Sequence, residues 1–143
     1  MAANNTSPIY TGIPDIQWID AVATANTTRD LTSGTSYLAF TADATNGGYL
    51  NKLRFAPKGT NIQTVARIWI NNGSTTGTAA NNLLFQEVLL IASTSSETSA
   101  LAFTEVPLDI ALPAGYKIYV TLGTTVSAGF MVGVVAGKYT QSS

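Results

Sequence analysis

The stretch Tyr116-Lys-Ile-Tyr-Val-Thr-Leu122 alternates between two faces, with Ile118, Val120 and Leu122 on one of them. An apolar face that repeats every second residue is typical of a β-strand with one side in a protein core. Segments of similar length, rich in β-branched and aromatic residues, recur along the chain between turns of Gly, Asn and Pro. They predict eight strands, within residues 16–20, 36–41, 49–56, 65–70, 83–90, 101–110, 116–122 and 129–137.

Eight short strands separated by turns predict an all-β protein of two packed antiparallel sheets, a sandwich of the jelly-roll kind. The number of strands alone does not distinguish a jelly roll from an immunoglobulin-like sandwich. The best candidate for a helix, residues 79–90, lacks a continuous apolar stripe of helical period, and Val88 and Ile91 favour a strand. Pro107 interrupts the sixth segment, which places that segment at a sheet edge or at a bulge.

The first 14 residues differ from the rest of the chain. They are polar and include Pro8 and Pro14, and each proline favours an extended conformation in the residue before it. We therefore expect an extended N-terminal arm over residues 1–14 that contacts a neighbouring molecule, and a single β-sandwich domain over residues 15–143. The N-terminus lacks the basic and apolar regions of a signal peptide.

The composition excludes several classes of function. The chain has no histidine and no cysteine, and general acid–base catalysis and tight transition-metal sites rely on these residues. Only 10% of the residues are charged, compared with about 25% in an average protein. A surface this neutral suits a protein whose faces are buried in an assembly. The net charge of −1 gives no electrostatic footprint for nucleic acid, and no apolar run is long enough to cross a membrane.

Two pairs of carboxylates have a spacing that a glycosidase could use. Asp15 and Asp20 lie five residues apart, on opposite faces of a strand, whereas Glu105 and Asp109 lie four apart, on one face. The same pattern is typical of solvated surface charge. The run Asp43-Ala-Thr-Asn-Gly47 lacks the alternating ligands of a calcium loop and predicts a tight turn. We therefore expect no catalytic, cofactor-binding or metal-binding residues, and no enzyme.

The two tryptophans allow different interpretations. Trp69 lies in an apolar segment, which favours a place in the core over stacking on a sugar or a base. Trp18 shares a strand face with Ile16 and Asp20, so both alternatives stay open for it.

Four of the seven basic residues cluster in the middle of the chain. They fit a contact patch and a salt-bridged surface equally well, and the sequence does not decide between the two. The four residues are Lys52, Arg54, Lys58 and Arg67.

Beyond the N-terminal residues, nearly the whole chain resembles the small β-sandwich virion proteins of tailed bacteriophages, some of which are capsid decoration proteins. The motifs are turns and strand starts, and they carry no catalytic signature. They are Ile13-Pro-Asp-Ile-Gln-Trp18, Thr24-Ala-Asn-Thr-Thr-Arg-Asp30, Leu53-Arg-Phe-Ala-Pro-Lys-Gly-Thr-Asn61, Ala66-Arg-Ile-Trp-Ile-Asn-Asn-Gly73 and Leu112-Pro-Ala-Gly-Tyr-Lys-Ile118.

The resemblance implies a non-enzymatic virion structural protein, most simply a capsid decoration (cement or auxiliary) protein that stabilises the head. Its expected partners are the major capsid protein and further copies of itself, with a trimer favoured. The alternative is a tail or head-fibre component that binds a receptor or a glycan, which exposed aromatic residues beside carboxylates or amides would favour. A glycan hydrolase is the weakest of the three hypotheses.

Overall fold

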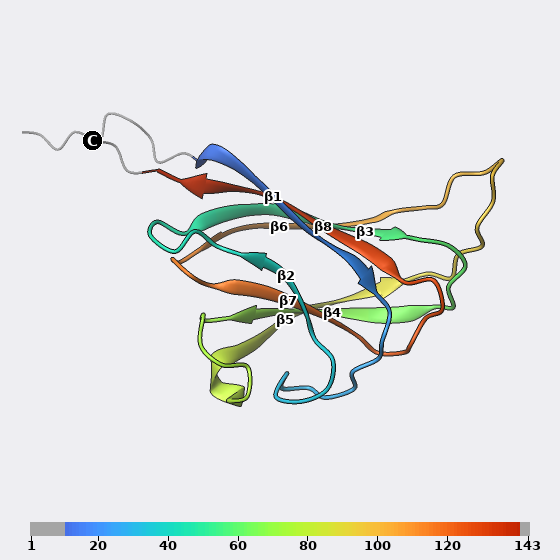
Figure 1. The fold of residues 1–143 in the computed structure, drawn as a ribbon, viewed down its shortest axis with the longest axis horizontal. Coiled ribbons are helices and arrows are strands. Elements are labelled where there is room, and N and C mark those ends of the chain that lie inside the picture. Colours follow the sequence, from blue (N-terminus) through green and yellow to red (C-terminus); the bar gives the residue numbers. More distant parts are fainter. Residues whose placement is uncertain (1–10, 141–143) are drawn as a thin grey trace, which may run out of the picture.

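The computed structural model describes residues 11–140, which form eight strands in two antiparallel sheets of four (Figure 1). The strands are β1 (Thr11–Val22), β2 (Tyr37–Thr41), β3 (Gly48–Pro57), β4 (Thr64–Asn71), β5 (Asn82–Leu90), β6 (Thr104–Leu112), β7 (Lys117–Leu122) and β8 (Phe130–Tyr139). The prediction of an all-β sandwich of eight strands is confirmed.

The order of the strands identifies the sandwich as a jelly roll. Sheet A has the order β1-β8-β3-β6 and sheet B has the order β2-β7-β4-β5. Strand β1 therefore pairs with β8, β2 with β7, β3 with β6 and β4 with β5. The topology is that of one long hairpin rolled up so that its two ends lie in opposite sheets, which is the jelly-roll arrangement.

The core lies between the two sheets and follows the predicted alternation. Ile118, Val120 and Leu122 of β7 are fully buried and belong to the main hydrophobic cluster. Three phenylalanines fill the space around them from both sheets: Phe40, Phe55 and Phe130.

Helical structure in the described part of the chain is limited to one 3-10 turn, Ala79–Asn81. The candidate helix over residues 79–90 is this turn followed directly by β5. Pairing with β4 takes up the backbone groups on one side of residues 82–90 in a sheet ladder, consistent with the strand preference of Val88.

The expected arm of residues 1–14 needs a correction at its C-terminal end. Residues 11–14 belong to β1, where Ile13 pairs with Lys138 and Pro14 pairs with Gly137 of β8. The extended preference around a proline suits an edge strand as well as a free arm, and β1 is an edge strand of sheet A. Residues 1–10 of the expected arm lie outside the described residues.

The prediction for Pro107 is confirmed in both of its forms. Strand β6 is the other edge of sheet A. Its register against β3 shifts between Ile110, which faces Leu50, and Pro107, which faces Lys52. The extra residue forms a bulge in which Asp109 has φ 48°, a left-handed conformation that aspartate tolerates better than most residues.

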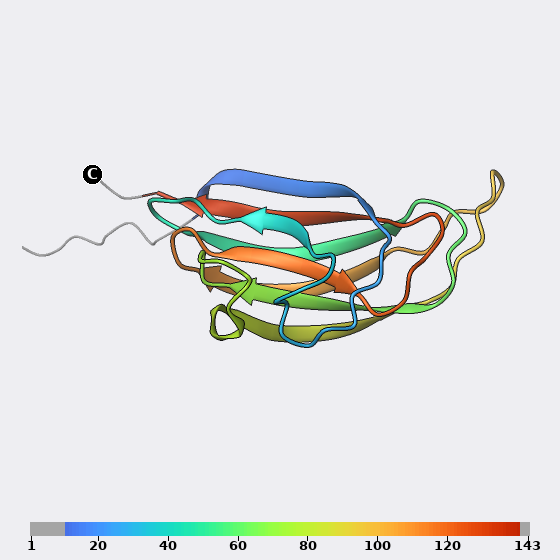
Figure 2. The same ribbon diagram turned by 60° about the horizontal axis from the view of Figure 1, so that its bottom comes forward.

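The connection between β1 and β2 forms an extra layer on the protein. This segment, residues 23–36, crosses the outer face of sheet B (Figure 2). The side chain of Asn26, which is 4% exposed, holds it together. Its Nδ2 donates to the carbonyl oxygens of Ser33 and Thr35, and its Oδ1 accepts from the N–H and hydroxyl of Thr28. We call residues 23–36 the cover segment.

Candidate functional site

The structure separates the two tryptophans. Trp69 is 1% exposed, so its predicted burial is confirmed. The preceding residue, Ile68, points into the core, so Trp69 faces the other side of sheet B, toward the cover segment. Its Nε1 donates to Oγ1 of Thr121, 3.1 Å away. Trp69 is therefore unavailable to a ligand.

Trp18 is 65% exposed on the outer face of sheet A, together with Ile16. Of the two alternatives that the sequence left open for Trp18, a place in the core is therefore excluded. Trp18 lies directly opposite Gly133 of β8, and Gly133 lies directly opposite Arg54 of β3. Because two strand spacings separate them, the backbones of Trp18 and Arg54 lie about 10 Å apart.

Gly133 leaves a gap in this face. A methyl group placed on its Cα would meet no heavy atom within 4 Å. Met131 and Val135 project from the same side of β8, two residues before and after it. Side chains of Trp18, Arg54, Met131 and Val135 thus surround an open glycine floor, and we call this site the Gly133 notch.

Charged side chains border the notch on the β3 side. The Oε2 atom of Glu105 lies 2.9 Å from Nζ of Lys52 and 2.9 Å from Nε of Arg54. The hydrogen bond from Lys52 and the charge of Arg54 hold the pKa of the Glu105 carboxyl below its ordinary value. The guanidinium of Arg54 also lies over the ring of Phe103, 4.9 Å from its centre. These contacts fix the guanidinium of Arg54 toward β6, on the side of β3 away from Gly133, so that the stem of Arg54 borders the notch.

A shallow hollow of about 420 Å³ continues along the same face. It lies where the register shifts at Asn51 and Asp109, and Tyr49, Val135 and Gly137 complete much of its lining. The Tyr49 hydroxyl donates to Oδ1 of Asp109 at 3.3 Å. Burial, followed by the nearby charge of Asp109, raises the pKa of Tyr49.

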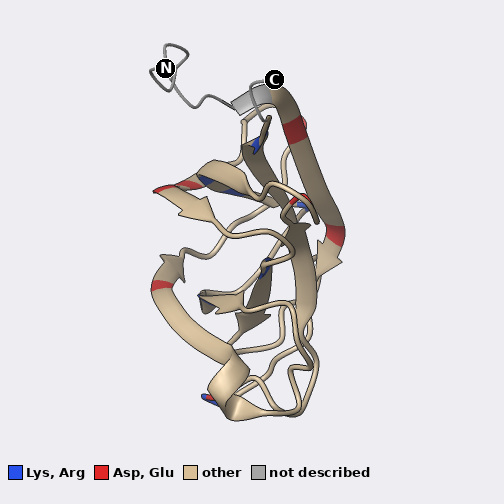
Figure 3. Ribbon diagram, turned by 90° about the vertical axis from the view of Figure 1, so that its left-hand side faces the viewer, with Lys and Arg blue, Asp and Glu red and all other residues tan. Residues whose placement is uncertain are grey.

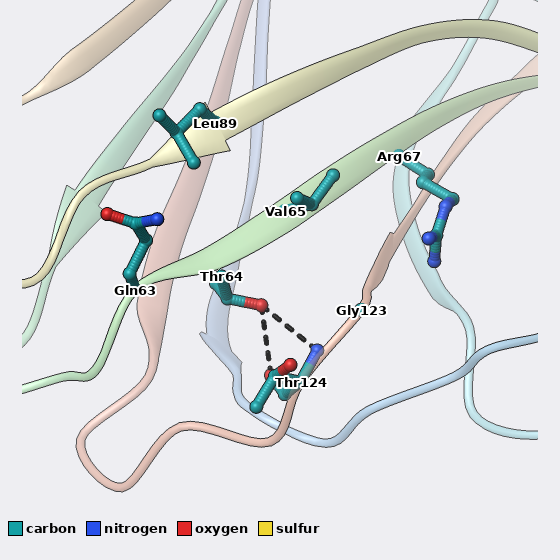
Figure 4. Close-up of a pocket in the computed structure, with 7 residues that line it drawn as sticks. All are labelled: Gln63, Thr64, Val65, Arg67, Leu89, Gly123 and Thr124. Atoms are coloured by element: carbon teal, nitrogen blue, oxygen red, sulfur yellow. Dashed lines mark hydrogen bonds between the residues drawn. The ribbon is translucent and has the colours of Figure 1, made fainter.

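A second hollow of about 280 Å³ opens at the end of sheet B, between β4, β5 and the β7–β8 connection (Figure 4). Thr64 and Thr124 close its floor, because Oγ1 of Thr64 donates to the carbonyl of Thr124 and accepts from its N–H. Arg67 forms part of the wall, but its Nε already donates to Glu87 at 3.0 Å. This carboxylate also accepts from Arg29, so the hollow offers no free cation.

The four clustered basic residues do not form one patch. Lys52 and Arg54 lie on sheet A with Glu105, and Lys58 pairs with Asp20 at 2.9 Å. Arg67 lies on sheet B with Glu87. Of the two interpretations, the salt-bridged surface is the one observed. Figure 3 shows how sparse the charges are on the ribbon as a whole.

The carboxylate pairs are not brought together into one site. Asp15 lies on the side of β1 that faces the other sheet and accepts from Gln17, whereas Asp20 is exposed beside Lys58. Glu105 and Asp109 share the outer face of β6, as expected from their spacing, but each has its own partner. Residues 11–140 contain no cluster of three or more Asp, Glu, His or Cys side chains able to hold a metal ion.

Edge strand β5 carries an apolar surface that the sequence did not single out. Three of its large apolar side chains, and that of the residue just after the strand, are exposed by 37 to 56%, whereas Leu90 at the end of the strand is buried. These residues are Leu83, Phe85, Leu89 and Ile91. By their register against β4, Leu83 lies on the core side of sheet B, opposite Ile70, and Leu89 lies on the outer side, opposite Val65. The four side chains thus flank the free edge of β5 on both faces, and we call them the β5 edge surface.

Comparisons with known proteins add no identification. Within the described residues, no helix is long and apolar enough to span a membrane. No protein-family model, curated protein or solved structure matches the chain.

Proposed function

We propose that the protein is a non-enzymatic structural protein that assembles with copies of itself, as a capsid decoration protein that binds the major capsid protein and stabilises a bacteriophage head. The resemblance to tailed-phage virion proteins supports this proposal, and so does the low content of charged residues, 10%. The jelly roll is compatible with it, since viral capsid proteins use this fold, but a fold does not by itself assign a function.

The observation that carries the proposal is the contrast between β5 and the other three edge strands. Natural edge strands avoid pairing with other chains through short length, prolines, charges or bulges. Strand β2 has only five residues, β1 contains Pro14 and two aspartates, and β6 contains Pro107 and a bulge. Strand β5 has nine residues with no proline and no lysine, and its protective features are a register shift at Phe85 and one charged residue, Glu87.

The only charge on β5 is already neutralised. Oε1 of Glu87 lies 2.7 Å from Nη1 of Arg29 and 3.0 Å from Nε of Arg67, both in the same molecule. A second copy can therefore approach β5 without meeting an unpaired carboxylate. The β5 edge surface then offers apolar contact and unpaired backbone groups to that copy. A second copy of the same chain is the simplest partner for a free sheet edge.

The test is sedimentation of the purified protein at micromolar concentration, at about 0.1 M and about 1 M salt, where the Debye length falls from about 10 to 3 Å. We expect an oligomer at both salt concentrations, because apolar contacts depend weakly on salt. Leu89→Lys is expected to give monomer. Leu38→Lys places the same charge on β2, the opposite edge of sheet B, and should leave the oligomer intact.

Three outcomes would count against the proposal. A monomer at both salt concentrations contradicts self-assembly, and dissociation only at high salt contradicts an apolar interface. Failure to co-sediment with heads built from the major capsid protein of the same genome contradicts the capsid assignment. The measured mass also gives the copy number: pairing of β5 with itself gives a dimer, whereas the trimer favoured above requires β5 to pack on a different surface of its neighbour.

A further inference from the structure

The Gly133 notch contains a glycine that the fold does not require. Glycines at five described turns have positive φ values, for example Gly34 at 78°, but Gly133 is not among them. A Cβ at this position would touch nothing within 4 Å. Glycine inside a strand weakens the sheet, and such a residue often marks a place where a ligand approaches the backbone closely.

The walls of the notch combine two kinds of chemistry. On one side, the exposed indole of Trp18 offers a flat apolar surface. On the other side, Arg54 and Lys52 supply hydrogen-bond donors and Glu105 supplies acceptors, all on one side of sheet A. A ligand that fits must therefore have an apolar face and, on its other edges, groups that both donate and accept.

We propose that the Gly133 notch binds a pyranose unit of a glycan. The C–H face of the sugar ring stacks on the indole of Trp18, and the glycine floor lets the ring lie close to β8. Adjacent hydroxyl groups of the sugar donate to Glu105 and accept from Arg54. The cation–π contact with Phe103 and the ion pair with Glu105 hold Arg54 in place before the sugar arrives.

The hollow beside the notch extends the site along the glycan chain. Val135 borders both the notch and the hollow, whose polar lining groups are Tyr49, Asn51 and Asp109. A second sugar unit in the hollow meets these polar groups. A peptide is the poorer fit, because β8 is an interior strand with partners on both sides, so its backbone is not free to pair with an added strand.

This binding site is independent of the proposed self-assembly. The notch lies on the outer face of sheet A, and the β5 edge surface lies on sheet B. The Leu89→Lys variant should therefore bind the glycan as the unaltered protein does. Loss of glycan binding and loss of assembly are measured separately.

Intrinsic fluorescence provides the first test. The chain has two tryptophans, and Trp69 is buried, so a change of emission on adding a sugar reports on Trp18. The probes are maltohexaose, cellohexaose, chitohexaose and hexagalacturonic acid, with decaproline as the peptide probe. We expect at least one oligosaccharide to shift the emission in a saturable manner and decaproline to have no effect.

Calorimetry on variants provides the second test. Trp18→Ala and Gly133→Val are each expected to weaken binding of the active oligosaccharide by roughly tenfold or more. Gly133→Val fills the notch, and its thermal unfolding should show no loss of stability, which separates blocking from misfolding. Arg54→Met keeps the apolar stem and removes the guanidinium, so it should also weaken binding. Leu89→Ala is the matched control on the other sheet.

The proposal is overturned if none of the four oligosaccharides shifts the emission. It is equally overturned if decaproline binds in their place, or if the sugar binds Trp18→Ala or a folded Gly133→Val as tightly as the unaltered protein. Tighter binding of hexagalacturonic acid than of the neutral sugars, lost at high salt, would assign the site to acidic glycans through the excess positive charge of Lys52 and Arg54.

Discussion

The side-chain amide of Gln17 forms two hydrogen bonds with the backbone of Thr41 and joins the two sheets at one edge of the sandwich. Nε2 of Gln17 donates to the carbonyl oxygen at 3.0 Å, and its Oε1 accepts from the N–H at 3.0 Å. Gln17 lies in β1 of sheet A and Thr41 in β2 of sheet B. The amide thus takes the place of a neighbouring strand for Thr41.

Replacing Gln17 by Ala is expected to destabilise the protein by about 1–3 kcal/mol, because it leaves two partly buried backbone groups of Thr41 unpaired. Chemical denaturation measures the loss. Gln17→Glu keeps the size but removes the donor and places a second carboxylate beside Asp15, which accepts from Nε2 of Gln17, so it should destabilise the protein at least as much as Gln17→Ala. Equal stability of all three proteins would show that the bridge between the sheets is not needed.

Removal of the Asn26 side chain should loosen the cover segment. Asn26→Ala deletes four hydrogen bonds of a buried residue and is expected to cost roughly 3 kcal/mol. Without its cover, Trp69 becomes accessible, so its emission shifts to longer wavelength. The measurement is made in a Trp18→Phe background so that only Trp69 reports. Thr27→Ala, at an exposed neighbouring position, is the control and should leave the emission unchanged.

Two glycines should respond in opposite ways to the same substitution. Gly34 has φ 78°, and an added Cβ would lie 2.9 Å from the side chain of Asn26, so Gly34→Ala is expected to cost about 1–2 kcal/mol or more. Gly133 has neither a positive φ nor an atom within 4 Å of an added Cβ. Gly133→Ala should therefore leave stability unchanged or raise it by about 0.5–1 kcal/mol. Thermal unfolding of the two variants side by side gives the comparison. A similar loss in both would mean that Gly133 is structural and would remove an argument for the notch.

The local pattern of the sequence was sufficient to predict the strands and the sandwich. The period of two at Ile118, Val120 and Leu122 reflects a one-sided core and survives in the structure. The assignment of Pro14 to a free N-terminal arm was wrong. An extended backbone suits both a free arm and an edge strand, and only the pairing with Gly137 distinguishes the two.

The candidate sites were less accessible to sequence reasoning. Burial of Trp69 was predicted, but its cover depends on contacts of Asn26 with residues seven and nine positions away. Gly133 looks like any other glycine in the sequence, since its neighbours Trp18 and Arg54 meet it only through the register of three strands. The β5 edge surface could have been found from Leu83 and Leu89 if the order of the strands had been known.

The last prediction concerns pH and rests on carboxylates with a lowered pKa. In Glu87, the hydrogen bonds from Arg67 and then Arg29 lower the pKa below its ordinary value of 4.5. In Asp43, the backbone N–H groups of Asn46 and Thr45 lower it below 3.8. A carboxyl whose pKa is lower in the folded state binds its proton more readily when unfolded. Its contribution to stability is therefore fully present well above these ordinary values and is lost as the pH falls through the folded-state pKa.

We expect the free energy of unfolding to change little between about pH 7 and 6 and to fall as the pH drops below 4.5, the ordinary pKa of glutamate. Glu87→Gln should lower stability at neutral pH and reduce the further loss on acidification, because the variant has no carboxyl to protonate at this position. Glu97→Gln is the matched control: Glu97 is exposed and takes part in none of the ion pairs found in residues 11–140. Denaturation curves at a series of pH values check both variants. If Glu87→Gln loses stability in acid as steeply as Glu97→Gln does, the two arginines do not hold Glu87 in its charged form.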